Sequence, residues 1–218
     1  MTTQTKDYKG MAMEGPIANW YAKNAVRGRE AEFEQAAQAI TQGLPAGGAV
    51  LEVAPGPGYL SILLARQGYQ VTGLDISRTF VEIERQNAAQ AGVSVDFHLG
   101  SASQMPFADA SFDRIVCQAA FKNFTRPLEA INEMHRVLRP GGFAIIFDMN
   151  ADTTNAELDR EAGLMHGWLN TLMTRYTFRM LRKQSYSPAS FKALVARSKF
   201  GACTIQPDGI GLAVWLRK

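Results

Sequence analysis

The loop after the first apolar run of the chain carries small residues at alternate positions, Ala54, Gly56 and Gly58, and Glu52 comes just before them. Small residues let a ligand lie against bare backbone, and a helix that starts directly afterwards offers unpaired N–H groups. A dinucleotide-binding fingerprint would need glycine at 54, 56 and 59, but position 54 is alanine and position 59 is Tyr59. The loop therefore indicates either another kind of binding turn or a purely structural turn.

A carboxylate follows the next apolar run, 70–74, at Asp75, 17 positions after Gly58. An ionised carboxylate accepts hydrogen bonds from both vicinal hydroxyls of a ribose, and it would repel an additional phosphate, which argues against NADP. The alternative is that Asp75 only caps the next helix. Thr79 and Glu82 have the spacing of a capping box at the start of that helix.

Short apolar runs alternate with helical patterns along the chain, which is typical of a parallel sheet with crossover helices. We therefore expect an α/β fold with a doubly wound, mostly parallel sheet and helices on both faces. In such folds ligands bind beyond the carboxyl ends of the strands, where the positions singled out above lie. The seven expected strands are 49–53, 70–74, 94–99, 112–118, 143–149, 203–206 and 211–216.

Length and composition favour one globular domain over residues 1–218, with an N-terminal helical cap (1–45) and a helical lid (151–187). No apolar run reaches the roughly 20 residues that span a bilayer, and the first ten residues do not resemble a secretory signal. The two cysteines, Cys117 and Cys203, lack the spacing of metal ligands. We expect a cytoplasmic protein without a metal site.

Two longer segments carry a resemblance to a known family. Residues 99–113 read LGSASQMPFADASFD, and residues 133–142 read EMHRVLRPGG. Together with the loop at 52–58 and Asp75, they resemble, in order and spacing, the motifs of class I S-adenosylmethionine-dependent methyltransferases. The resemblance extends over about 50–149 and is strongest to the small-molecule group similar to the ubiquinone/menaquinone C-methyltransferases. It implies the Rossmann-like methyltransferase fold, with S-adenosylmethionine as cofactor and S-adenosylhomocysteine as product.

The resemblance also implies which residues hold the cofactor. Asp75 would bind the ribose, and Ile76 would pack on the adenine. Two positions depart from the family pattern: Ala54 replaces a glycine, which we expect to be tolerated through a negative φ, and Ser101 replaces an aspartate, which we expect to weaken cofactor binding somewhat. The full set of implied cofactor residues is Glu52, Ala54, Gly56, Gly58, Asp75, Ile76, Ser101, Ala102 and Gln118.

The methyl acceptor is less well defined, because no general base stands out. His98 and His135 fall within scaffold elements and are interpreted as structural. Lys122 and Asn123 follow the fourth strand. Either both orient a substrate oxygen, or Lys122 faces solvent and Asn123 shapes the turn. Aromatic and apolar positions in the cap and lid favour a small apolar or aromatic acceptor. The candidate catalytic residues are Tyr21, Lys122, Asn123, His166 and Tyr176.

Every charged residue between Arg175 and Lys199 is basic, which indicates either a solvated helix face or attraction to an acidic substrate or an anionic membrane. The net charge of +3 is too small to predict a nucleic-acid partner. Three alternatives stay open: an RNA methyltransferase on the same fold, a protein that binds this cofactor but catalyses another reaction, and a membrane-associated enzyme acting on a lipid quinone. A monomer and a homodimer are both compatible with the sequence.

Overall fold

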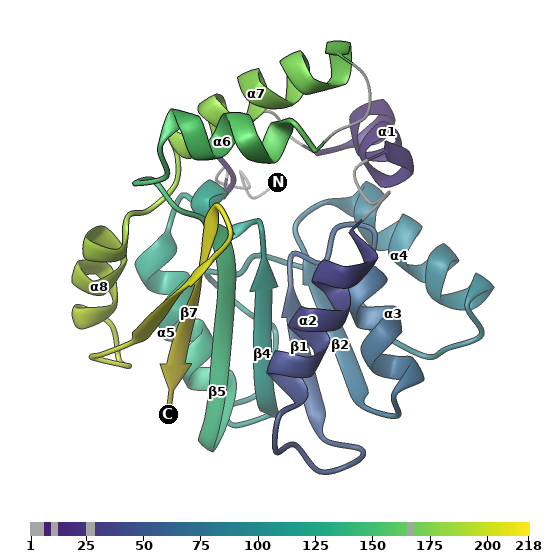
Figure 1. Ribbon diagram of the computed structural model, residues 1–218. Coiled ribbons are helices and arrows are strands. Elements are labelled where there is room, and N and C mark those ends of the chain that lie inside the picture. Colours follow the sequence, from purple (N-terminus) through teal and green to yellow (C-terminus); the bar gives the residue numbers. More distant parts are fainter. Residues whose placement is uncertain (1–6, 10–12, 25–28, 165–167) are drawn as a thin grey trace, which may run out of the picture.

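The computed structural model describes residues 7–9, 13–24, 29–164 and 168–218, with the side chains of 168–170 excepted. These residues form a seven-stranded sheet in the order β3-β2-β1-β4-β5-β7-β6, flanked by helices on both faces (Figure 1). The strands are β1 (Ala49–Val53), β2 (Gln70–Asp75), β3 (Asp96–Leu99), β4 (Phe112–Gln118), β5 (Leu138–Met149), β6 (Thr204–Asp208) and β7 (Gly211–Arg217). The helices are α1 (Gly15–Asn24), α2 (Glu30–Thr41), α3 (Tyr59–Arg66), α4 (Arg78–Gln90), the 3-10 turn η1 (Phe121–Asn123), α5 (Pro127–Val137), α6 (Asn155–Ala162), α7 (Trp168–Arg182) and α8 (Pro188–Ala196).

Successive side chains of the central strands point to opposite faces of the sheet, and each face packs against a different set of helices. On one face, Val50 and Val116 pack with α2 and α3. On the other face, Leu51 and Ile115 pack with α5 and α8. Both sides of β1 and β4 are therefore buried, as the near-continuous apolar runs of these strands require.

The strands β1 to β5 are parallel, and β7 joins β5 antiparallel. The sequence order reverses at β1, which has β2 on one side and β4 on the other. In open α/β sheets a ligand crevice forms at this reversal, outside the carboxyl ends of the strands. The expected fold class is confirmed.

Two local expectations are wrong. The helix α4 is capped by Ser77, whose hydroxyl accepts a hydrogen bond from the Phe80 amide at 3.0 Å, so Thr79 and Glu82 form no capping box. The strand β5 begins at Leu138 and not near 143, because Leu138 already pairs with Phe112 before a register shift. A sharp Pro-Gly-Gly sequence thus lies inside an irregular strand.

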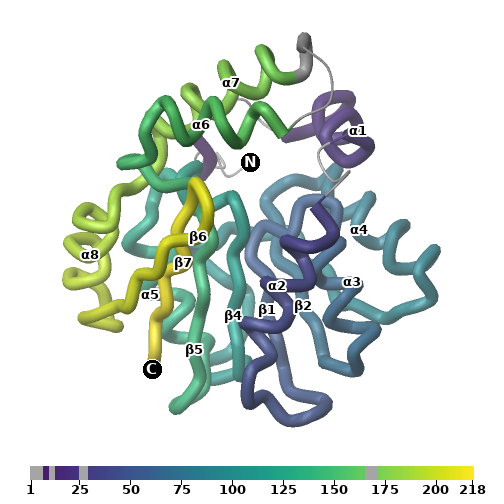
Figure 2. The backbone as a smooth tube through the Cα atoms, viewed as in Figure 1, coloured from purple at the N-terminus to yellow at the C-terminus, as the bar shows by residue number. Residues whose placement is uncertain are grey.

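Two helices lie above the carboxyl edge of the sheet, and the tube view shows the same arrangement (Figures 1 and 2). These are α6 and α7, which belong to the expected lid. Of the expected cap, α1 is tied to the start of α4: Glu14 accepts from the Arg78 amide at 2.9 Å and from the Thr79 amide at 3.0 Å, a favourable place for an anion. The helix α2 instead packs on the sheet. Among the described helices, none has the length and apolar character needed to cross a membrane.

Candidate active site

The loop between β1 and α3 has an unusual backbone. Ala54, Gly56 and Gly58 all have positive φ, at 57°, 59° and 79°. The negative φ expected for Ala54 is therefore wrong, and this residue carries the roughly 1–2 kcal/mol cost of a left-handed conformation for an L residue with a Cβ. A Cβ added to Gly56 would meet no atom within 4 Å, so the loop turns open backbone toward the edge of the sheet.

A second strained alanine faces this loop. Ala119 follows β4 with a φ of 58°, and its amide donates to the Phe147 carbonyl at 2.7 Å. Non-glycine residues in this region persist only where their surroundings hold them, and such residues cluster at functional sites. The strain at Ala54 and Ala119 therefore marks the point where β1 and β4 end.

A small cavity of about 50 Å³ lies between these two loops. Its wall includes four of the cofactor residues predicted from the sequence: Glu52, Ala54, Gly56 and Gln118. The whole lining is Tyr21, Arg29, Phe33, Glu52, Ala54, Pro55, Gly56, Pro57, Gln118 and Ala119. The structure thus brings together residues from α1, the β1 loop and the end of β4.

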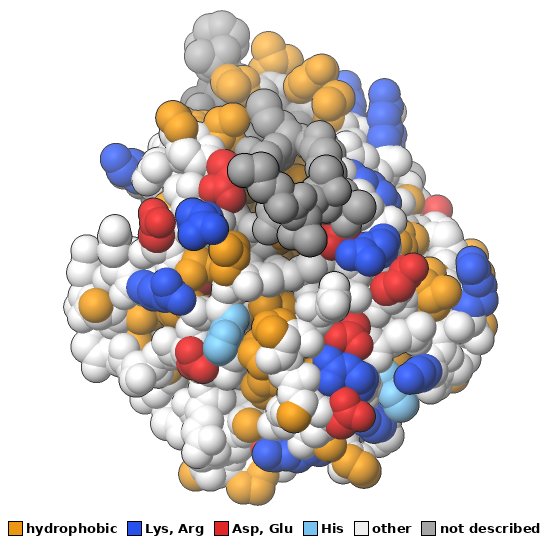
Figure 3. All heavy atoms as spheres, turned by 180° about the vertical axis from the view of Figure 1, so that it is seen from behind, with side chains coloured by type: hydrophobic (Ala, Val, Ile, Leu, Met, Phe, Trp, Pro, Cys, Tyr) orange, Lys and Arg blue, Asp and Glu red, His pale blue; other side chains and the backbone are white. Residues whose placement is uncertain are grey.

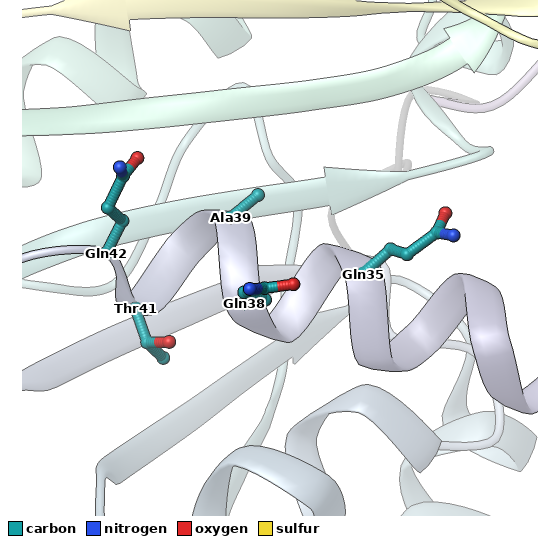
Figure 4. Close-up of a pocket in the computed structure, with 5 residues that line it drawn as sticks. All are labelled: Gln35, Gln38, Ala39, Thr41 and Gln42. Atoms are coloured by element: carbon teal, nitrogen blue, oxygen red, sulfur yellow. The ribbon is translucent and has the colours of Figure 1, made fainter.

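A larger hollow of about 490 Å³ lies elsewhere, along α2 (Figure 4). It is lined by Gln35, Gln38, Ala39, Thr41 and Gln42. All five belong to one helix and its C-terminal end, and none is ionisable. Despite its size, this hollow is a surface depression without the groups that a reaction needs.

Asp75 lies at the end of β2 and is only 4% exposed. One carboxylate oxygen accepts from the Ser77 amide at 2.8 Å, and the other accepts from the Gly56 amide at 3.3 Å. Burial raises the pKa of Asp75 to about 6, against the lowering effect of these amides. Asp75 is thus ionised at neutral pH and fixed against the glycine loop.

Glu52 is the second buried acid of the site and is 3% exposed. Its carboxylate accepts a short hydrogen bond from the Ser61 hydroxyl of α3. Burial raises the pKa of Glu52 to about 7, and the charge of Asp75 adds to this rise. A cation bound nearby would favour the ionised form of Glu52.

The adenine-side residues lie at the neighbouring strand ends. Ile76 is 42% exposed beside Asp75, which leaves its side chain free to pack on a flat ring. Ala102 is half-buried against the core behind this edge. The Ser101 hydroxyl donates to Asp7 at 2.6 Å, a contact with the N-terminal segment that the sequence patterns did not predict.

The candidate catalytic residues are only partly brought to this site. Tyr21 lines the cavity and packs edge-on against Phe80, with ring centroids 6.0 Å apart. Asn123 is buried; its amide donates to Ala120 and its carbonyl accepts from the Lys9 amide, so its backbone shapes the turn. Tyr176 is 68% exposed on α7, and His166 lies outside the described residues.

Lys122 does not match either expectation. It is buried, and its ammonium donates to Asp148 at 2.9 Å and to the Ala119 carbonyl. The Asp148 carboxylate also accepts from the backbone amide of Lys122 at 2.8 Å. Lys122 therefore neither faces solvent nor is free to orient a substrate oxygen. Its hydrogen bond to the Ala119 carbonyl instead stabilises the strained turn.

Sequence patterns also missed a third buried acid. Glu84 on α4 is fully buried, and neither of its carboxyl oxygens has a hydrogen-bond partner. It lies close to the glycine loop, since a Cβ on Gly58 would be 3.3 Å from the Glu84 Cγ. Burial raises the pKa of Glu84 to about 10, and the charges of Asp75 and Glu52 contribute to this rise. Its spacing from Val81 and Ala88 on the apolar face of α4 is the signal that could have revealed it.

Comparison with known proteins agrees with this geometry. Residues 51–146 match the methyltransferase domain family. The chain is 37% identical over 101 residues to a demethylmenaquinone methyltransferase of Deinococcus radiodurans, and 38% identical over 109 residues to a ubiquinone/menaquinone biosynthesis C-methyltransferase of Roseobacter denitrificans. Over this segment the chain is similar to the class I S-adenosylmethionine-dependent methyltransferases. The matched regions cover 45% and 48% of this chain, but only 42% and 44% of the two relatives.

Solved structures of this methyltransferase fold extend the match to nearly the whole chain. A protein of Methanococcus maripaludis described as an S-adenosylmethionine-dependent methyltransferase has a TM-score of 0.71 at 21% identity and covers 96% of this chain and 95% of its own. The cyclase SpnF shares the fold with a TM-score of 0.57 at 22% identity, covering 85% of this chain and 80% of its own. At such identities the match shows the fold alone, and the cyclase illustrates that one fold serves different reactions.

The family's cofactor is S-adenosylmethionine, and the residues present fit it. The glycine loop leaves open backbone where a Cβ would otherwise stand, and the buried Asp75 carboxylate can accept from ribose hydroxyls. Glu52 lies in the wall of the cavity, so a carboxyl group belongs to its lining. The chemistry of this donor set suits a ligand with a ribose and a positive charge.

Proposed function

We propose that this methyltransferase transfers a methyl group from S-adenosylmethionine to a small apolar or aromatic molecule. The observation that carries the proposal is the convergence of the open glycine loop, the buried Asp75 and the β4 end at one point of the sheet. The nine cofactor residues inferred from the sequence keep their assigned roles in this proposal. The alternatives, RNA methylation and a different reaction with the same cofactor, have no specific observation in their favour.

The chain's own residues would act mainly by binding and alignment. S-adenosylmethionine, when bound, supplies an activated methyl group, so the protein must align the acceptor and exclude water. Asp75 holds the ribose, Glu52 offers a negative charge to the cationic part, and Tyr21 closes the cavity from α1. No histidine among the described residues lines this cavity, which suits an acceptor that loses its proton easily.

A phenolic ring, such as the reduced (hydroquinone) form of a quinone, would meet this requirement. Both relatives described above are named for quinone methylation, and one is named as a C-methyltransferase. A phenolic or hydroquinone ring is acidic and electron-rich, so its carbon or oxygen can attack a methyl group without a strong protein base. We infer that the acceptor is a ring of this chemical class.

The first test is binding of the cofactor. Calorimetric titration should show binding of S-adenosylmethionine and S-adenosylhomocysteine and none of NAD. Asp75→Ala should weaken binding about ten- to hundredfold, because hydrogen bonds to a charged acceptor contribute about 1.5–3 kcal/mol. Asp96→Ala, which removes an exposed carboxylate at the start of β3, should bind like the wild type. If the wild type binds neither sulfur compound, the proposed function is wrong.

Cofactor binding should also depend on pH through Asp75. Its pKa of about 6 in the free protein means that acid converts it to a neutral group that accepts ribose hydrogen bonds less well. Protonation of Asp75 should therefore weaken binding of S-adenosylhomocysteine about tenfold at pH 5, where about a tenth of Asp75 stays ionised. Asp75→Asn should remove this step from the titrations, and a step that persists in that variant would assign it to another group.

The outer face of α7 favours contact with an anionic membrane surface. Four large apolar side chains there are exposed: Leu172, Met173, Tyr176 and Met180. Seen from behind, hydrophobic side chains gather at the top of the molecule with Lys and Arg side chains beside them (Figure 3). Of the basic side chains of α7, Arg175 and Arg179 share Asp159, so the helix keeps a positive excess beside its apolar face. Such a pairing is typical of interfacial helices.

Vesicle co-sedimentation tests this contact. The protein should sediment with phosphatidylglycerol vesicles, less with phosphatidylcholine vesicles, and less again at high salt. Met173→Glu combined with Tyr176→Glu should reduce sedimentation roughly fivefold or more, because it removes apolar surface and adds repulsion. Thr177→Glu, an exposed change on the same helix, is the matched control. Equal loss in all variants, or a switch to dimerisation through this face, would contradict membrane contact.

A further inference from the structure

A short N-terminal segment, Asp7 to Lys9, is tied across the loops that follow β3 and β4. Tyr8 pairs with Phe124 in an antiparallel bridge. The Lys9 amide donates to the Asn123 carbonyl at 2.7 Å, and the Thr125 amide donates to the Asp7 carbonyl at 3.4 Å. In the view of Figure 1 the segment is the short purple piece beneath α6, at the carboxyl edge of the sheet.

The Asp7 side chain has more polar partners than a surface carboxylate needs. Arg126 donates to both of its oxygens, at 3.0 Å and 2.6 Å. The hydroxyls of Ser101 and Ser103 donate to one of these oxygens at 2.6 Å and 3.2 Å. The Asp7 side chain is only 10% exposed, and the hydrogen bonds from Arg126 lower its pKa, so it is held as an anion. We call this group of four side chains the Asp7 clasp.

The clasp adjoins the cofactor site on its β3 side. Ser101 follows β3 directly, and the neighbouring Gly100 amide donates to the Asp75 carbonyl at 2.8 Å. The Asp7 carboxylate thus lies one strand away from the carboxylate proposed to hold the ribose. Ser101 and Asp7 are 94 positions apart in the chain, so only the fold brings them together.

Tyr8, the middle residue of the segment, is partly buried. Burial raises the pKa of its phenol, and electrostatic interactions with Tyr21, Asp75 and Asp148 add to this rise. Tyr21 lines the cavity, Asp75 ends β2 and Asp148 lies in β5. The groups that raise the pKa of the phenol therefore lie on both sides of the β1–β4 crevice. A neutral phenol held there is a hydrogen-bond donor to a ligand in the crevice.

We propose that Asp7 is a positioning residue for the cofactor: the Asp7 clasp holds residues 7–9 as a wall of the cofactor pocket and so presents Tyr8 to the bound molecule. This inference rests on the proposed use of S-adenosylmethionine. When the clasp is broken, residues 7–9 leave this position part of the time, and the apparent affinity falls in proportion to the fraction that remains in place.

Titration with S-adenosylhomocysteine tests the proposal without requiring the methyl acceptor. Asp7→Asn and Arg126→Met should each raise the dissociation constant about tenfold and speed release of the ligand, as followed by stopped-flow fluorescence. The double variant should be no worse than either single one, because both changes break the same clasp. Tyr8→Phe should show a smaller loss, since it removes one hydroxyl and keeps the segment anchored.

Thermal unfolding separates positioning from a general structural role. The Arg126 side chain is 41% exposed, and residues 7–9 carry the Asp7 carboxylate into water when the clasp breaks, so the midpoint should hardly change in the clasp variants. Arg139→Met is the matched control, since Arg139 is 45% exposed and pairs with Asp113 at the opposite end of the sheet. That variant should bind like the wild type.

Failure of this proposal and failure of the proposed function give different results. If the wild type binds S-adenosylhomocysteine and the clasp variants bind it equally well, or if their lost affinity follows a matching loss of thermal stability, Asp7 is not a positioning residue. A wild type that binds neither sulfur compound would instead refute the proposed function itself.

Discussion

Lys122→Met is expected to lower the free energy of unfolding by about 3–5 kcal/mol, because it leaves the carboxylate of Asp148 buried without its cation. The two side chains are 5% and 3% exposed, and the Lys122 Nζ lies 2.9 Å from an Asp148 oxygen. Methionine keeps the unbranched shape and most of the length of the side chain, and it removes the charge and its donors. Urea unfolding followed by circular dichroism at pH 7 measures the change.

A second variant separates the buried charge from general damage to the core. Lys122→Met combined with Asp148→Leu should recover most of the loss, since replacing both members of a buried pair by apolar residues is often neutral. The surface variant Arg139→Met should cost less than about 1 kcal/mol. If Lys122→Met also lowers the free energy of unfolding by less than about 1 kcal/mol, water reaches the Asp148 carboxylate, contrary to its burial.

This ion pair also connects stability to the cofactor site. The Lys122 ammonium donates to the Ala119 carbonyl, and Ala119 lines the cavity with a φ of 58°. Without Lys122 the Ala119 carbonyl loses its donor, and the hydrogen bond from the Ala119 amide to Phe147 is left to hold the left-handed turn, which can then relax toward an ordinary conformation. Lys122→Met should therefore weaken binding of S-adenosylhomocysteine as well, even in the fraction that stays folded.

Local sequence patterns were sufficient for the scaffold. Apolar runs predicted each strand to within a few residues, except where β5 starts, because the pairing of Leu138 with Phe112 is a tertiary contact that no local pattern contains. The glycine loop and Asp75 were found at the predicted places, because a tight turn and a strand end leave strong local signals. The sign of φ at Ala54 was missed, since alanine normally avoids that region and only the fold imposes it.

The candidate site was predictable only where its parts are close in sequence. Asp7 joins Arg126 from 119 positions away, and Lys122 finds Asp148 across 26 positions, so neither pairing has a local pattern. Before the fold is known, a lysine after a strand is equally compatible with catalysis, solvent and an ion pair. The contact of Ser101 with Asp7 was missed for the same reason, because Asp7 lies outside the motif that contains Ser101.

Glu84 gives the second large effect, and here substitution should stabilise the protein. Its pKa of about 10 in the folded state lies above the usual glutamate pKa of 4.5, so at pH 7 the unfolded chain loses this proton and the folded chain keeps it. Between these two pKa values the group lowers the free energy of unfolding by about 1.4 kcal/mol for each unit of rising pH. At pH 7 the accumulated loss is about 3 kcal/mol, and Glu84→Met, which is apolar and of similar length, should recover it.

The pH dependence is what identifies this effect. The advantage of Glu84→Met over the wild type should be small at pH 5.5 and larger by about 4 kcal/mol at pH 8.5, measured by urea unfolding at both values. Glu82→Met, on the exposed side of the same helix, should stay within about 0.5 kcal/mol of the wild type throughout. An advantage that is equal at both pH values would mean that apolar packing alone stabilises the variant. The buried acid would then be ionised and partnered in solution, and the glycine loop would rest against a charge.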